Sequence, residues 1–219
     1  MSKRKESDGT KERSQGVTRR GFLKGAGLSA AGAAIIDSGL LAAGQSGPTV
    51  SEPVVMGPGL VPITLRVNGA ERKMKIEPRT TLAEALRFEL GMTGTKVVCD
   101  RGSCSACTVW LDGTPVCSCM MLAIDVTDRA VTTIEGISSN DTLHPVQEAF
   151  IEHDALQCGF CTPGMIMSCA ALLKRNPRPT LDDVKDAVSG NLCRCGTYPK
   201  VFDATLAAAG VMGQKKEEA

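Results

Sequence analysis

The chain has 219 residues, of which only 3% are aromatic, and a formal net charge of +1. So few aromatic rings weaken any interpretation based on the stacking of nucleobases. Residues 1–24 hold eight Lys or Arg and three Asp or Glu, so the rest of the chain has 17 basic and 21 acidic groups. This mildly acidic body offers no electrostatic reason to bind DNA or RNA, and no nucleic-acid partner is expected.

Residues 1–44 have the character of a targeting segment rather than of folded structure. A basic stretch ends in TRRGFLK at 18–24, and small, moderately apolar residues follow at 25–44, interrupted by Asp37. A spanning helix of ~20 residues would be more apolar and uncharged, so no stable membrane span is expected. The twin arginine resembles a twin-arginine (Tat) export signal, which predicts a bacterial protein exported to the periplasm by the Tat machinery. The alternative is a disordered basic tail that leads into an uncleaved anchor.

The first half of the remaining chain predicts a compact α+β unit over residues 61–137, after a Pro- and Gly-rich linker at 45–60. In residues 80–91, Thr81 and Glu84 form a capping box and Gly91 ends the expected helix. The other expected elements are a hairpin of strands 63–69 and 72–78, a second hairpin at 108–118 and a strand at 130–136.

The second half predicts a small all-α unit of four helices over residues 142–210, followed by a charged tail at 211–219. Thr162 is the expected N-cap of the second helix, with Pro163 at its first position. Thr180 is the expected N-cap of the third helix, and acidic residues occupy its first turn. The expected helices are 144–155, 162–175, 180–190 and 198–210.

The first group among the ten cysteines has the spacing C-x4-C-x2-C at Cys99, Cys104 and Cys107. This is the ligand spacing of plant-type [2Fe–2S] sites, in which a tight loop aims three thiolates and its own N–H groups inward. The fourth ligand would come from the following hairpin. Cys117 and Cys119 are two residues apart and would face the same side of one strand, so spacing leaves both candidates open.

The second group consists of Cys158-x2-Cys161, before one expected helix, and Cys193-x-Cys195, after another. If those helices are antiparallel, four thiolates converge at one end of the bundle. Spacing favours two iron–sulfur clusters over two alternatives. A four-cysteine zinc site usually has two to four residues between both pairs of ligands, and C-x-C is tighter than that. A disulfide framework would suit an exported protein, but Tat export carries folded proteins, with metal already bound.

Four motifs in order carry a family resemblance: CDRGSCSACTV, SCMMLA, HPVQEAFIEHDALQCGFCTPGM and SGNLCRCGTY. They closely resemble the two-cluster iron–sulfur subunit of the molybdenum hydroxylases, the xanthine dehydrogenase and aldehyde oxidase family. The resemblance covers residues 61–210. The Tat-like leader is similar to that of periplasmic aldehyde oxidoreductase small subunits.

The resemblance implies a β-grasp, plant-type ferredoxin domain at 61–137 and a four-helix [2Fe–2S] domain at 142–210. It makes Cys119 the fourth ligand of the first cluster and leaves Cys117 spare. Gln157 would contact the pterin of the molybdenum cofactor. The implied ligands are Cys99, Cys104, Cys107 and Cys119 for one cluster, and Cys158, Cys161, Cys193 and Cys195 for the other.

The function implied is electron transfer, with aldehyde or N-heterocycle oxidation on a large molybdopterin-binding subunit. Electrons would pass from molybdenum to the helical-domain cluster, then to the ferredoxin-domain cluster, then to FAD on a medium subunit or to an external acceptor. The alternative is a free-standing soluble ferredoxin-like carrier, against which Gln157 argues, because a diffusing shuttle needs no pterin contact. No residue of this chain is expected to be catalytic.

Two positions depart from the family pattern, which usually has Gly before the first ligand and Gly after Cys104. Here these positions hold Val98 and Ser105, and Val98 requires an ordinary negative φ. Cys169, inside the helix at 162–175, is expected to be a small buried residue rather than a redox-active thiol. The histidines, His144 and His153, are expected to be partly solvated helix residues rather than metal ligands.

Overall fold

The structure is a computed structural model that describes residues 57–139 and 142–217. The expected export signal at 1–44 and most of the linker at 45–60 lie outside these residues. Within the described ranges, no helix combines the length and the apolar character needed to cross a membrane.

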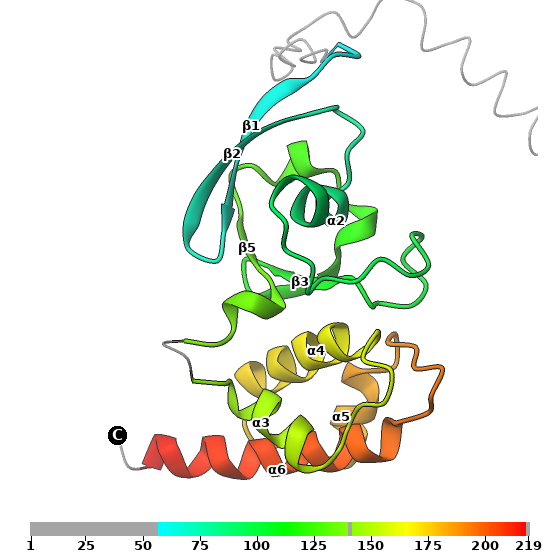
Figure 1. Cartoon of the computed structure of the whole chain (residues 1–219). Helices are drawn as coiled ribbons and strands as arrows, with labels where there is room; N and C mark the ends of the chain where they lie inside the picture. Colours follow the sequence, from blue (N-terminus) through cyan, green and yellow to red (C-terminus); the bar gives the residue numbers. More distant parts are fainter. Residues whose placement is uncertain (1–56, 140–141, 218–219) are drawn as a thin grey trace, which may run out of the picture. The chain divides into compact units, whose positions relative to one another are not determined.

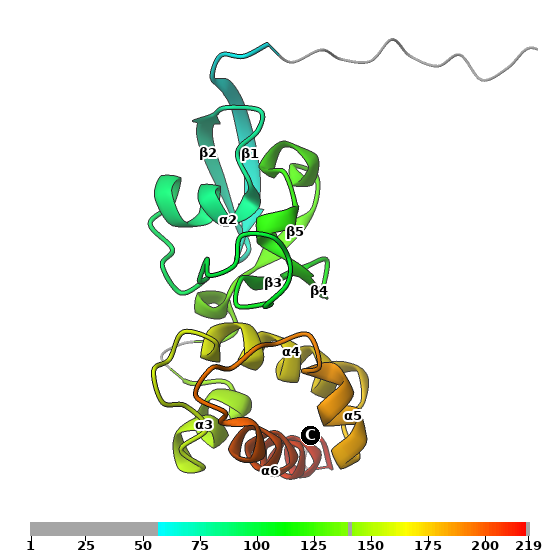
Figure 2. The same cartoon turned by 90° about the vertical axis from the view of Figure 1, so that its right-hand side faces the viewer.

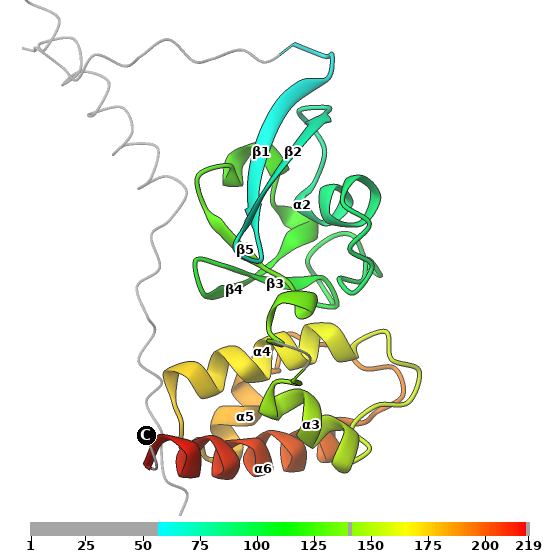
Figure 3. The same ribbon diagram turned by 60° about the vertical axis from the view of Figure 1, so that its left-hand side comes forward.

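The first half forms a five-stranded mixed sheet in the order β2-β1-β5-β3-β4. The central strand β5 is parallel to β1, and the other neighbours are antiparallel (Figure 1). The short helices lie against this sheet (Figure 3). The strands are β1 Val61–Val67, β2 Ala70–Ile76, β3 Thr108–Leu111, β4 Thr114–Cys117 and β5 Ala130–Thr132.

Both hairpins turn where the sequence predicts. Asn68 and Gly69 have φ of 51° and 78°, and Asp112 and Gly113 have φ of 51° and 80°. Two successive positive φ values match the right-handed twist of the flanking strands, and Asn-Gly and Asp-Gly adopt them at low cost. The arrangement is the expected β-grasp, with one buried core that includes Leu65, Leu86, Val109 and Leu111 among others.

The expected helix at 80–91 is only partly α-helical. The capping box of Thr81 and Glu84 is present, and α2 Leu82–Glu84 follows it. The chain then widens into a π-helical segment, η1 Ala85–Glu89, in which the N–H of Leu90 donates to the carbonyl oxygen of Ala85. Gly91, with a φ of 67°, follows and ends the segment. Three 3-10 turns complete this half: η2 Ser118–Met120, η3 Ala123–Val126 and η4 Ile134–Gly136.

The second half contains the four expected helices, which surround a second core (Figure 2). They are α3 Pro145–Glu152, α4 Thr162–Arg175, α5 Leu181–Ala187 and α6 Tyr198–Glu217. The central helix is α4, in which every residue from Gly164 to Leu173 is buried. It packs against α3, α5 and α6 and also against β3 and β4.

Of the two capping predictions in the second half, one is confirmed and one is wrong. The Thr180 hydroxyl accepts from the N–H of Asp183 at 3.2 Å and caps α5. Thr162, by contrast, is the first residue of α4, and the cap position belongs to Cys161, which makes no side-chain cap bond. The helix therefore begins one residue early, and Pro163 occupies its second position.

Candidate metal centres

The first cysteine loop runs from Cys99 to Cys107, and three residues with positive φ fold it back on itself. They are Asp100 at 53°, Gly102 at 69° and Ser105 at 53°. The left-handed region favours glycine, which agrees with Ser105 standing where the family pattern has Gly. Because of these turns, Cys104 and Cys107 are buried while Cys99 stays half-buried.

The three thiols of this loop and the thiol of Cys119 lie in two pairs. Cys99 interacts with Cys104, and Cys107 interacts with Cys119. Backbone N–H groups also converge on the sulfurs: the hydrogen bond from Arg101, with those of Ser103 and Cys104, lowers the pKa of Cys99 to about 7. Burial, with the neighbouring Cys119, raises the pKa of Cys107 to about 12. Two pairs of thiols surrounded by backbone N–H groups can hold two irons.

Cys117 and Cys119 do not share one strand face, so that expectation is wrong. The strand β4 ends at Cys117, because the Ser118 hydroxyl donates to the carbonyl oxygen of Cys107 at 2.7 Å and the chain turns into η2. Cys119 is 6% exposed, and its sulfur accepts the N–H of Gly102 at 3.3 Å. The sulfur of Cys117 instead lies 3.5 Å from the Ser105 hydroxyl and 3.9 Å from the Gly102 carbonyl oxygen.

The second group of thiols meets as the helix arrangement predicts. Cys161 interacts with Cys193, and Cys158 interacts with Cys195. Burial and the contact with Cys193 raise the pKa of Cys161 to about 12. Burial opposes ionisation of Cys193 too, but hydrogen bonds from Thr197 and others lower its pKa to about 7. This site therefore also consists of two pairs.

The donor arrangement fits a two-iron cluster. All ten cysteines are free thiols. In the part of the chain that the structure describes, no group of three or more His, Cys, Asp or Glu side chains could hold one metal ion. Four thiols in two pairs match a [2Fe–2S] centre, which takes two protein ligands on each iron.

An unpaired hydroxyl next to the second site also fits a bound cluster. The Thr162 hydroxyl, one residue after Cys161, is buried and has no hydrogen-bond partner within the described residues. A buried hydroxyl normally has a partner, because leaving it unpaired costs free energy. The sulfurs of a bound cluster would offer acceptors at this end of α4.

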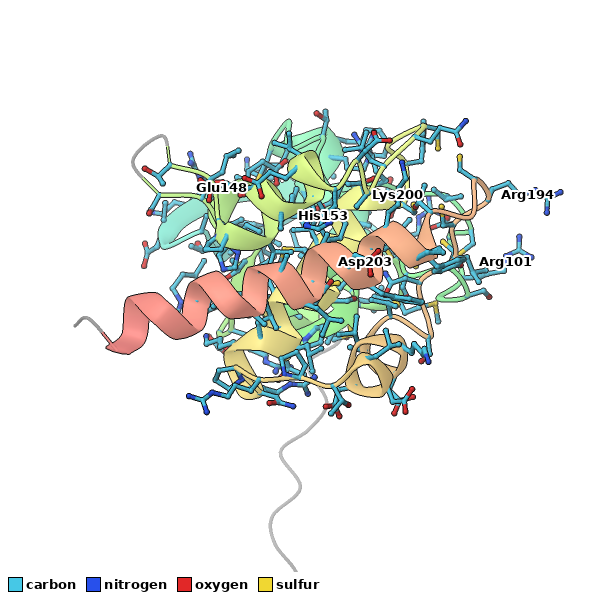
Figure 4. The ribbon with its side chains drawn as sticks, turned by 90° about the horizontal axis from the view of Figure 1, so that it is seen from below. Arg101, Glu148, His153, Arg194, Lys200 and Asp203 are labelled. Carbon is cyan, nitrogen blue, oxygen red and sulfur yellow. The ribbon has the colours of Figure 1, made fainter. Side chains whose placement is uncertain are left out.

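The second site lies at the surface of the helical half. Cys158 and Cys195 are exposed, and Gln157 beside Cys158 is exposed as well. Three large apolar side chains next to these cysteines are also exposed: Leu156 at 39%, Phe160 at 59% and Leu192 at 57%. Arg194 extends outward beyond the start of α6, and Arg101 of the first loop also points to solvent (Figure 4).

The remaining candidates have structural roles. Cys169 is completely buried, and burial raises its pKa to about 12, which fits a small core residue. His144 is the N-cap of α3 and accepts from the N–H of Val146 at 3.2 Å. His153 lies half-buried at the other end of α3. Val98 is 57% exposed beside Cys99.

Sequence reasoning missed Asn191. Its side chain is 3% exposed and reaches from the second cysteine loop, residues 190–195, to the first, where Nδ2 donates to the carbonyl oxygen of Ser105 at 3.1 Å. In the sequence it is one polar residue after a helix-ending Gly190, which is an ordinary loop pattern. The only signal in the sequence was the Cys-x-Cys motif two residues later, which indicates that this loop carries metal ligands.

Comparison with known proteins gives matches across both halves. Residues 65–131 match the family described as "2Fe-2S iron-sulfur cluster binding domain", and residues 133–206 match "[2Fe-2S] binding domain". The chain is 40% identical over 209 residues to the aldehyde oxidoreductase iron-sulfur-binding subunit PaoA of Escherichia coli O157:H7, and the alignment covers 89% of each chain.

Two further relatives match the folded part. The nicotine 6-hydroxylase small subunit of Paenarthrobacter nicotinovorans is 46% identical over 155 residues, which cover 71% of this chain and 93% of the relative. A chain of quinoline 2-oxidoreductase from Pseudomonas putida 86 superimposes with a TM-score of 0.68 at 42% identity, over 71% of this chain and 98% of that one.

Proposed function

The chain belongs to the family of iron–sulfur subunits of the molybdenum hydroxylases, and on that premise we propose its cluster ligands, its partner-binding face and its cellular location. It is the electron-transfer subunit of a molybdenum-containing oxidoreductase and binds [2Fe–2S] clusters. Substrate turnover then belongs to a partner subunit, and the chemistry of this chain is to hold the clusters.

The eight proposed ligands follow from the four thiol pairs. Cys99 with Cys104 and Cys107 with Cys119 hold the cluster of the β-grasp domain. Cys119 is chosen over Cys117 because it is the buried thiol that pairs with Cys107 and accepts the N–H of Gly102. Cys158 with Cys195 and Cys161 with Cys193 hold the cluster of the helical domain. Each cluster, when bound, takes up and gives up one electron.

The residues around the thiols set how readily that electron is held. N–H groups aimed at sulfur stabilise the more negative, reduced state of a site, and burial opposes it. In the first loop the amides of Arg101, Gly102 and Ser103 supply these N–H groups. In the second, the Thr197 hydroxyl lies 3.3 Å from the Cys193 sulfur.

The surface around the second site is the proposed contact with the molybdopterin-binding subunit. Exposed ligands such as Cys158 and Cys195 need protection from solvent and oxidants. The exposed apolar side chains Leu156, Phe160 and Leu192 frame them, as at a protein interface. Gln157 lies in the same exposed segment, where it could reach the pterin of the partner.

Electrons therefore enter at the helical-domain site and leave from the β-grasp site. The proposed acceptor is FAD on a third subunit or an external electron carrier. The proposed substrate is an aldehyde or an N-heterocycle, in keeping with the relatives named aldehyde oxidoreductase and nicotine 6-hydroxylase.

We further propose that the twin arginine at residues 19 and 20 directs Tat export to the periplasm. The motif TRRGFLK at residues 18–24, followed by the small, moderately apolar stretch at 25–44, supports this. The test is cell fractionation of a variant with Lys at both positions, with Arg13→Lys as the matched control. Retention of the double variant in the cytoplasm supports Tat export of the wild-type protein. An unchanged amount of the double variant in the periplasm contradicts it.

The observation that carries the cluster assignment is the set of four thiol pairs at two sites. The test is anaerobic purification of the complex with iron analysis and low-temperature EPR. We expect about four irons per chain and two distinct signals on reduction, since each [2Fe–2S] centre contributes two irons. An iron-free protein without a signal would contradict the assignment. A chain that always elutes alone would contradict the subunit role.

A further inference from the structure

The two cysteine loops, far apart in the sequence, are joined by a direct backbone hydrogen bond. The N–H of Leu192 donates to the carbonyl oxygen of Cys104 at 3.1 Å. Cys104 is a proposed ligand of the first cluster, and Leu192 immediately precedes Cys193, a proposed ligand of the second. One hydrogen bond and a few covalent bonds therefore connect a ligand of each site.

Asn191 holds this junction from inside the protein. Its side-chain oxygen accepts the Ser168 hydroxyl of α4 at 2.9 Å, and its side-chain nitrogen donates to the carbonyl oxygen of Ser105 at 3.1 Å. Its backbone carbonyl oxygen accepts the hydroxyl of Tyr198 at 3.0 Å. The side chain is almost completely buried, and its bond to Ser168 lies in the interior, where water does not compete for it.

The acceptor on the first loop is equally fixed. The carbonyl oxygen of Ser105 also accepts the N–H of Thr108 at 3.2 Å and its hydroxyl at 2.7 Å. On its other side lies Gly164 of α4, where an added Cβ would come within 2.3 Å of this oxygen. Asn191 therefore connects three elements: the first cysteine loop, α4 and the second cysteine loop.

We propose that Asn191 is a positioning residue for electron transfer between the two clusters. Its amide holds the N–H of Leu192 against the carbonyl oxygen of Cys104. The electronic coupling between the two sites then runs through covalent bonds and one hydrogen bond rather than through space. The proposal rests on the proposed cluster ligands. In the transfer one site loses one electron and the other gains it, and no bond to protein forms or breaks. The molybdenum centre of the partner supplies the electron.

The experiment compares Asn191→Asp with Asn176→Asp in the assembled complex. Asp at position 191 keeps the volume and the acceptor for Ser168 but removes the donor to Ser105. Asn176 is the matched control, because its side-chain nitrogen donates at 3.3 Å to Asp183, within the helical half. The readouts are iron content, the two EPR signals, the magnetic interaction between the two reduced clusters, and the rate of electron transfer between them.

For Asn191→Asp we expect normal iron content and both signals, a weaker magnetic interaction and a lower transfer rate, because without the amide donor the two loops are held together less closely. The Asn176 variant should match the wild type in every readout. An Asn191 variant with unchanged interaction and rate would overturn the proposal. If the wild type itself lacks four irons or two signals, the ligand assignment has failed, which is a separate result.

A second variant covers the case in which Asn191→Asp does not fold. Ser168→Ala leaves Asn191 in place but removes the hydroxyl that orients its side-chain oxygen. The transfer rate should then fall by a smaller factor than for Asn191→Asp, with iron content unchanged. A rate equal to that of the wild type in this variant would count against a positioning role.

Discussion

Trp110 on β3 donates a hydrogen bond from Nε1 to the carbonyl oxygen of Met167, in the middle of α4, at 2.9 Å. The ring lies in the core of the helical half, together with Phe150, Met165 and others, rather than in the core of the sheet that carries it. The only tryptophan of the chain therefore connects the two halves, through this hydrogen bond and through packing of its ring.

Trp110→Phe tests how much this connection contributes to stability. Phe fills part of the space but leaves the carbonyl oxygen of Met167 without its donor, a loss of ~1–2 kcal/mol. We expect the thermal midpoint to fall by roughly 2–8 °C, measured by calorimetry. As a control, Lys174→Met removes only the ammonium group 5.6 Å from the ring centroid and should have a smaller effect. Equal midpoints for Trp110→Phe and wild type would show that the bond contributes little.

A pair of serine substitutions tests the choice between Cys117 and Cys119. Cys119→Ser should abolish one EPR signal and about two of the four irons, because it removes a proposed ligand. Cys117→Ser should keep both signals, since that sulfur faces the Ser105 hydroxyl and the Gly102 carbonyl oxygen. The reverse pattern would make Cys117 the ligand.

Two helical glycines provide a matched test of how closely α4 approaches the first cysteine loop. Gly164→Ala places a Cβ 2.3 Å from the Ser105 carbonyl oxygen, so the helix or the loop must shift. We expect lower stability and a weaker first EPR signal. Gly210→Ala on α6 meets nothing within 4 Å and should raise stability by ~0.5–1 kcal/mol. Denaturant unfolding of both variants measures the contrast, and a stabilising Gly164→Ala would contradict the close packing.

His144 predicts a pH dependence of stability. Burial lowers its pKa, with Glu148 acting weakly in the opposite direction. The unfolded chain therefore binds a proton more readily, and stability should fall as the pH drops below the ordinary histidine value of ~6.5 towards the lower folded value. Protonation of Nδ1 would also remove the cap on Val146. His144→Asn, which keeps a capping side chain, should show a shallower decline of unfolding free energy between pH 7.5 and 5.5. Parallel curves would exclude His144 as the cause.

Removal of iron predicts an order of thiol reactivity. In the cluster-free chain, Cys99 and Cys193 have pKa values of about 7, through the hydrogen bonds described above, and should be alkylated first at pH 7.5. Cys169, whose pKa burial raises to about 12, should react last. Mass spectrometry after short exposure to iodoacetamide measures the order. With iron bound, Cys99 and Cys193 should be protected, and labelling of Cys193 at an unchanged rate would argue against its role as a ligand.

The fold was largely predictable, because its signals are local. Asn68-Gly69 and Asp112-Gly113 predicted both hairpins, and Thr180 with Asp183 predicted the start of α5. The failures occur where tertiary contacts override local preference. The Ser118 hydroxyl bonds to the Cys107 carbonyl oxygen and bends the chain, so Cys119 leaves the strand that simple alternation assigned to it.

The site was predictable in its residue types but not in its connections. Cysteine spacing indicated which segments would meet, and the thiols of Cys161 and Cys193 do meet. Spacing contains nothing about the junction between the loops, however. The contacts of Asn191 with Ser105 and Ser168 depend on the packing of α4 against the first loop, which no short motif encodes.

The order of the two cysteine groups along the chain has a consequence for biosynthesis. All thiols of the first site have been synthesised once η2 is made, whereas Cys158 and Cys161 must wait for Cys193 and Cys195, a delay of seconds at ~5–20 residues per second. During that interval two thiols have no partners, and the junction through Leu192 cannot form. The second site therefore cannot be complete until Cys195 has been made, whereas all ligands of the first site exist from Cys119 onward.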